Sequence, residues 1–266
     1  MKITKWLLLA ALAFLCCACS KNNPLAYVDE DADKILYFNL TDEINSDIWD
    51  EFLKNKFWEL DMNSENELLG VDLKKNPSKI AHWVRYPRSK DERRICKTVI
   101  VFQEYEAKKF LDKASEYYKD KYKSQGGEAE DTKIDDCPAI ICKRKEYYSD
   151  KKIIDMTIIA SGDHIVQIIQ SDKDVSEVLK PDGKCDLAKK INDDAVHAEA
   201  ISADYQRHRQ QEKADDLKKR KEQGYPLSAS EKNFKVLNVG DKIEHDYIKG
   251  DELVSEQTID TDELDD

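Results

Sequence analysis

The apolar residues of this chain are gathered into short runs of strand length, and this pattern constrains the fold more than any other feature. β-branched and aromatic residues are frequent in six such runs, at residues 34–40, 80–86, 95–103, 139–145, 153–160 and 164–170. Runs of this length and composition are typical of strands in a sheet with a covered face. Gly162 and Asp163, between the last two runs, predict a tight hairpin and therefore antiparallel pairing.

Helical patterns separate the strand-like runs. Residues 41–60 predict a helix, because Thr41 can cap its first turn and apolar residues follow at helical spacing. Residues 104–125 predict a second helix, which ends where two glycines follow it. Residues 175–179 predict a short third helix.

The predicted order of elements is β-α-β-β-α-β-β-β-α, which indicates the α+β class. Strand pairs joined by hairpins and separated by helices favour a mostly antiparallel sheet with the helices packed on one face. We expect this arrangement within a single domain spanning residues 34–192.

Beyond residue 192 the pattern supports two interpretations. Residues 195–203 fit either a strand that opens a second unit or the start of an Ala-rich helix. Residues 205–223 are charged nearly all round, which predicts an exposed helix. The region 193–256 is therefore predicted to be a second incomplete unit or a charged helix plus a hairpin. Residues 257–266 are acidic and predict a disordered tail.

Residues 1–18 have the pattern of a secretory signal peptide. Two lysines precede the uninterrupted apolar run 6–15, which is shorter than the roughly 20 residues that a spanning helix needs. Ala18 then precedes Cys19. This ending resembles the lipobox of bacterial lipoproteins, in which a small residue comes before the acylated cysteine. The chain departs from the lipobox at Cys16, where an aliphatic residue is usual.

The resemblance implies that Cys19 carries the lipid and becomes the new N-terminus, with residues 19–33 as a tether. It further implies a location in the bacterial cell envelope, with the mature domain outside the cytoplasm and the membrane as its partner through Cys19. One acyl chain holds a protein only marginally, whereas two or three hold it stably. No second apolar stretch of the sequence approaches spanning length.

The segment PLAYVDEDADKILYFNL, residues 24–40, resembles the start of a loose group of uncharacterised bacterial envelope proteins. In that group a proline, a Tyr-Val and an Asp-Ala-Asp precede the first strand. This chain differs from the group in having Asp-Glu where Pro-Ala is common. The resemblance implies an α+β fold with repeated β-β-α units, and it implies no activity.

The charge of the chain restricts its partners. The formal net charge is −12, and removal of residues 1–18 takes away two lysines and no acid, which gives −14. An acidic surface repels phosphate backbones, so no nucleic-acid partner is expected. A partner protein in the envelope is compatible with this charge.

Four cysteines remain besides Cys19 and those of the signal region, and in an exported protein they predict disulfides. Cys137 and Cys142 are five residues apart, about 16 Å if the chain between them is extended, which is too far for a bond unless a turn intervenes. Cys137 and Cys185 lie in loop-like sequence, whereas Cys96 and Cys142 lie in strands. We therefore favour the pairs Cys137–Cys185 and Cys96–Cys142. Buried free thiols are the alternative for the two strand cysteines.

The sequence carries no local signature of a metal or cofactor site. The five histidines are scattered, and neither paired-cysteine knuckles nor glycine-rich phosphate loops occur. His197 and Glu199 alternate onto one strand face and are interpreted as a surface pair. We therefore expect neither a metal nor another cofactor.

Catalytic signatures are equally sparse. Residues 161–164 contain Ser, Asp and His, but their adjacent positions in a tight turn send the side chains apart. No catalytic residue is assigned, and the patterns favour a lipid-anchored envelope protein with a non-catalytic binding or scaffolding role. Two alternatives stay open. One is a periplasmic chaperone or inhibitor that binds extended chains at a sheet edge, and the other is an enzyme whose site has no local motif.

Overall fold

A computed structural model provides the structure, and it describes residues 23–40, 67–72, 75–89, 92, 94–146, 151–171, 180–249 and 252–259. The described strands are β1 (Lys34–Leu40), β2 (Glu67–Leu68), β3 (Val71–Asp72), β4 (Ser78–Arg85), β5 (Ile95–Phe102), β6 (Glu128–Ile134), β7 (Cys137–Lys145), β8 (Lys152–Ser161), β9 (Ile165–Gln170), β10 (His197–Ile201), β11 (Lys242–Lys249) and β12 (Glu252–Ile259). The described helices are the 3-10 helix η1 (Pro24–Tyr27), α3 (Ala107–Ser124), α4 (Asp186–Lys189), α5 (Ala203–Glu222) and α6 (Ala229–Lys232).

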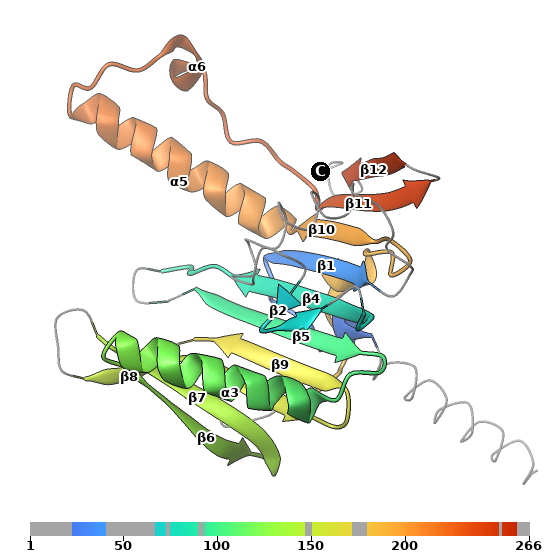
Figure 1. Cartoon of the computed structure of the whole chain (residues 1–266). Helices are drawn as coiled ribbons and strands as arrows, with labels where there is room; N and C mark the ends of the chain where they lie inside the picture. The colour runs from blue at the N-terminus through green and yellow to red at the C-terminus, as the bar shows by residue number, and fades with distance from the viewer. Residues whose placement is uncertain are drawn as a thin grey trace, which may run out of the picture.

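Among the described strands, all but β2 and β3 form one ten-stranded antiparallel sheet (Figure 1). The strand order is β12-β11-β10-β1-β4-β5-β9-β8-β7-β6. Strand β1 lies in the interior, where Lys34 pairs with Ile201 of β10 on one side and Val84 of β4 on the other. The sheet is therefore continuous across the predicted boundary between residues 192 and 193.

The predicted α+β class and antiparallel sheet are confirmed. The six predicted strand runs appear as β1, β4, β5, β7, β8 and β9. Residues 195–203, left open between strand and helix, contain the strand β10. The prediction missed β6, because its residues are mostly polar and exposed at the edge of the sheet.

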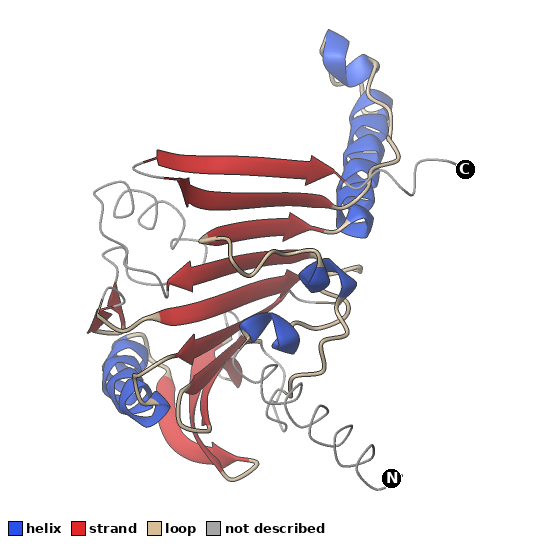
Figure 2. Cartoon of the chain, turned by 90° about the vertical axis from the view of Figure 1, so that its right-hand side faces the viewer, coloured by secondary structure: helices blue, strands red, loops and turns tan. Residues whose placement is uncertain are grey.

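Both faces of the sheet carry a hydrophobic core. On one face, α3 packs over β6 to β9, and Phe110 joins a cluster that extends to Phe38 of β1. On the other face, η1 and α4 contribute Leu25 and Leu187 to a second cluster (Figure 2). Burial of each side chain of this size contributes about 1.5–3 kcal/mol. The expectation of helices on one face is therefore corrected, because two short helices cover the opposite side.

Helix α5 extends away from the sheet (Figure 1). Its buried residues are Ala203 and Leu217, which agrees with the predicted charged, exposed helix. Its first turn stays attached to the body of the protein, because the rings of Tyr205 and Tyr86 stack with centroids 4.2 Å apart. Helix α5 thus contacts the residue that directly follows β4.

Several predicted segments lie outside the described residues. They are the signal peptide, the lipidation site Cys19 and the predicted helices at 41–60 and 175–179. Strand β12 continues to Ile259, so residues 257–259 of the predicted tail belong to the sheet. Within the described ranges, no helix is both long enough and apolar enough to cross a membrane.

Gly127, at the junction of α3 and β6, provides a test of this packing. A Cβ atom there would lie 2.4 Å from the carbonyl oxygen of Lys143 and 3.1 Å from the Tyr122 ring. Because the nearer atom belongs to the backbone of β7, the strand has to move. We expect Gly127→Ala to lower the free energy of unfolding by about 1–3 kcal/mol, measured by urea denaturation.

Lys123→Ala, at an exposed position one turn earlier, is the control and should change stability by less than about 0.5 kcal/mol. Equal stability of the two variants would contradict the close approach.

Candidate functional site

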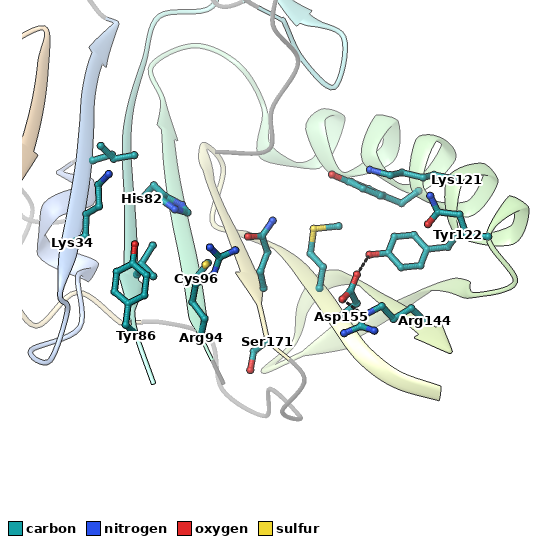
Figure 3. Close-up of a pocket in the computed structure, with 16 residues that line it drawn as sticks. Lys34, His82, Tyr86, Arg94, Cys96, Lys121, Tyr122, Arg144, Asp155 and Ser171 are labelled. Atoms are coloured by element: carbon teal, nitrogen blue, oxygen red, sulfur yellow. Dashed lines mark hydrogen bonds and ion pairs between the residues drawn. The ribbon is translucent and has the colours of Figure 1, made fainter. Parts of the chain in front are cut away.

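A cavity of about 710 Å³ opens on the α3 face of the sheet. It lies between the C-terminal half of α3 and the part of the sheet formed by β1, β4, β5 and β9. Figure 3 shows strand residues on one side of it and α3 residues on the other. This volume is within the range of about 300–1,000 Å³ that is usual for small-molecule sites.

Strand register builds the floor of the cavity. Lys34, Val84, Cys96 and Gln170 lie directly opposite one another on four neighbouring strands, and all four line the cavity. Because side chains alternate across a strand, residues in such a row face the same side of the sheet. Residues far apart in the sequence therefore share one surface.

His82 is a buried polar group in this floor. Its Nδ1 atom lies 2.9 Å from the Thr98 hydroxyl, on the neighbouring strand β5. Burial lowers the pKa of His82 to about 4, and the positive charges of Arg94 and Lys34 add to the effect. The imidazole is therefore neutral at physiological pH.

The carboxylate of Asp155, on β8, connects the sheet to α3 on the other side of the cavity. It accepts a 2.6 Å hydrogen bond from the Tyr122 hydroxyl and another from Arg144 Nε. The register between β7 and β8 shifts after Cys142 and passes over Asp155, which makes it the extra residue of a β-bulge. Bulges redirect side chains, and this one directs Asp155 toward α3.

The same contacts fix the protonation of the wall. Burial raises the pKa of Tyr122, and its hydrogen bond to Asp155 raises it further. The hydroxyl therefore stays protonated and acts as a donor. Each oxygen of Asp155 accepts one of these hydrogen bonds, so the fold fixes the position of this carboxylate.

The rim of the cavity includes Tyr86, which follows β4. Its backbone N–H donates a 2.8 Å hydrogen bond to the buried carboxylate of Asp33. The same carboxylate pairs with Arg88, and the Ser202 hydroxyl lies 3.5 Å away. These bonds, together with the ring stack on Tyr205, hold the Tyr86 side chain in place.

The four described cysteines are free thiols, so the predicted pairs Cys137–Cys185 and Cys96–Cys142 are corrected. Cys96 and Cys142 lie on the same face, but β9 and β8 separate their strands. Three interstrand steps of about 4.8 Å place them about 14 Å apart, beyond the reach of a disulfide.

Cys137 and Cys185 pack in different hydrophobic clusters. Burial raises the pKa of Cys96 and Cys185, and burial with the nearby Asp155 raises that of Cys142 to about 12. These three thiols are therefore protonated, and the alternative of buried free thiols describes Cys96 and Cys142.

His197 is fully buried, which corrects its interpretation as a surface residue. Its strand β10 lies inside the sheet, and its Nδ1 atom lies 2.7 Å from a carboxylate oxygen of Asp246 on β11. The Ser255 hydroxyl donates to the same carboxylate. Serine therefore contacts the acid and not the histidine, so this group does not form a nucleophile–base pair. Glu199 pairs instead with Lys34.

The turn at residues 161–164 connects β8 and β9, as predicted. Gly162 has a φ of +66°, which favours glycine at this point of the hairpin. The Nδ1 atom of His164 lies 3.0 Å from the Tyr105 carbonyl oxygen. In the described ranges, no group of three or more His, Cys, Asp or Glu side chains has the arrangement of a metal site.

Comparison of the chain with known protein families, with curated proteins and with solved structures gave no match.

The sequence predicted the strands of the cavity but not the cavity itself. His82, Val84 and Tyr86 occur at every second position, which indicates a shared strand face. Their proximity to Lys121 and Tyr122 of α3 depends on register and helix packing, which carry no local motif. For strand β5, the sequence predicted a disulfide at Cys96 and gave no sign that this residue lines a cavity.

The depressed pKa of His82 makes stability depend on pH. The unfolded side chain titrates near 6.5 and the folded one near 4, so the unfolded state binds the proton first as the pH falls. The stabilisation is complete above pH 6.5 and is lost between 6.5 and 4. At about pH 4.5 we expect a loss of about 2–3 kcal/mol from this residue.

The measurement compares urea unfolding of the wild type and His82→Asn at about pH 7.5 and about pH 4.5. Asparagine can keep a polar contact with the Thr98 hydroxyl but does not titrate. The difference between the two pH values should be smaller in the variant by the stated amount. The same pH dependence in both proteins would contradict a neutral, buried His82.

Proposed function

We propose that this protein is a lipid-anchored protein of the bacterial cell envelope that binds a small ligand in the cavity on the α3 face and does not transform it. The observation that carries the proposal is the cavity, which gathers polar and aromatic side chains from six strands and one helix. The lipobox resemblance at Cys19 supports the anchored location. The net charge of −12 is consistent with a partner that is not a nucleic acid.

The chemistry of the cavity favours binding over catalysis. Cys96 is a protonated thiol, His82 Nδ1 contacts the Thr98 hydroxyl, and Asp155 accepts hydrogen bonds from Tyr122 and Arg144. His82 and Asp155 stand on strands three interstrand steps apart, about 14 Å. The described lining residues thus offer fixed contacts and no nucleophile beside a base. An enzyme without a local motif is the less favoured alternative.

A second candidate function is the binding of an extended chain at the sheet edge. Strand β12 is the last strand of the sheet at one end, and most of its residues are exposed. Such an edge can accept a further strand. Against this function, β12 carries Glu252 and Glu256, and charged residues on an edge discourage strand addition. The cavity is therefore preferred as the site.

The anchored location is tested by Cys19→Ser. The variant loses the acylated thiol, so it should leave the membrane fraction and appear in the soluble fraction after cell disruption. Immunoblots of both fractions provide the measurement. The matched control is Cys16→Ser, which should leave the protein in the membrane fraction. A Cys19→Ser protein that stayed with the membrane would contradict lipidation at that residue.

The binding site is tested by filling the cavity. Gln170 lies in the floor and is half-buried, so Gln170→Trp should occupy space that a ligand needs. In a thermal-shift screen of small molecules, compounds that stabilise the wild type should give at most a small shift with the variant. Thr132→Trp, at an exposed position on β6, is the control and should behave like the wild type. Equal shifts in all three proteins would place binding elsewhere.

A further inference from the structure

The described lining of the cavity is basic, although the chain as a whole is acidic. Lys34, Arg94, Lys121 and Arg144 line it together with one described acid, Asp155. In a chain with 55 acidic and 43 basic residues, a random surface would carry more acids than bases. The local excess of positive charge therefore distinguishes this surface from the rest of the protein.

Two of these cations are used within the protein. Arg144 donates to Asp155 over 2.6 Å. Lys34 lies 3.1 Å from a carboxylate oxygen of Glu199, and both side chains are largely buried. These pairs hold the walls of the cavity and leave little charge for a ligand.

Arg94 and Lys121 are different. Across the described residues, no carboxylate lies within ion-pair distance of either one. Lys121 Nζ lies 5.5 Å from the Tyr118 ring centroid and 5.6 Å from that of Tyr117, which positions the ammonium group without neutralising it. Arg94 interacts with the neutral Cys96 thiol. The two cations approach the cavity from opposite sides, one before β5 and one on α3 (Figure 3).

Apolar and aromatic side chains lie among the polar ones in the cavity. Leu36, Val84 and Met156 form part of the floor, and Tyr86 and Tyr118 stand at the sides. A volume of about 710 Å³ is far more than a bare phosphate or sulfate ion fills. The cavity thus fits a molecule with an apolar body and a negatively charged group.

We propose that the ligand is a small organic anion, whose apolar body lies on the sheet floor and whose carboxylate, sulfonate or phosphate group is bound at one of the two cations, Arg94 or Lys121. This inference rests on the proposed function of the cavity and adds the chemical class of its ligand. Arginine and lysine are the usual partners of such groups, because both donate charge-assisted hydrogen bonds.

The test uses two fluorescent probes that differ in charge. 8-Anilinonaphthalene-1-sulfonate is an aromatic anion, and N-phenyl-1-naphthylamine is its neutral counterpart without the sulfonate. At least one of the variants Arg94→Gln and Lys121→Gln should weaken the anionic probe about tenfold or more, because it removes a charge-assisted hydrogen bond to the sulfonate. Affinity for the neutral probe should change less than about twofold.

Controls separate charge from folding. Lys218→Gln, on the exposed face of α5, removes the same charge far from the cavity and should leave both affinities unchanged. Thermal melts of all variants verify that they fold. Raising the salt from about 0.05 M to about 0.5 M should weaken the anionic probe in the wild type.

The outcomes distinguish the two proposals. If the glutamine variants weaken both probes equally or neither, the anion inference is overturned and the binding cavity stands. If Gln170→Trp leaves both affinities intact, or if neither probe binds the wild type saturably, the cavity is not a binding site and both proposals fail.

Discussion

The buried carboxylate of Asp33 is the constraint on which the centre of the molecule depends. It stands just before β1 and accepts a hydrogen bond from the backbone of Tyr86 and a contact from Arg88. The backbone of Asp33 also bonds to Val84 and Ser202. A buried carboxyl group has to be hydrogen-bonded to other groups of the protein. Meeting that requirement sets the ends of β1 and β4 and the start of α5 relative to one another.

The cavity follows from this arrangement and from the shape of the sheet. Helix α3 covers the strands from β6 to β9, whereas the cavity floor includes residues of β1, β4 and β5 beyond the helix. The β-bulge at Asp155 then directs a carboxylate to α3, where it accepts hydrogen bonds from Tyr122 of the helix and from Arg144 of β7. Asp155, the one acid of the described lining, is thereby hydrogen-bonded within the protein. Arg94 and Lys121 then give the surface of the cavity its positive charge.

Periodicity in the sequence predicted the regular elements and could not predict their interior contacts. The apolar stripe of α3 and the alternation in β4 reflect burial, which acts on each segment separately. Strand β6 was missed because an edge strand needs few apolar residues. His197 was misassigned because its burial depends on the strands that flank β10. Register, bulges and pairing across long separations carry no local pattern, and they assemble the cavity.

The pairing of β1 with β10 also sets the order in which the molecule can form. Asp33 and Ser202, which meet at this junction, are 169 residues apart. Closing so long a loop carries an entropic cost, and folds rich in such contacts form slowly. Until β10 is available, one edge of the apolar strand β1 lacks its neighbour and can pair with another chain. The long separation between β1 and β10 thus leaves the edge of β1 exposed until the chain between them has been brought together.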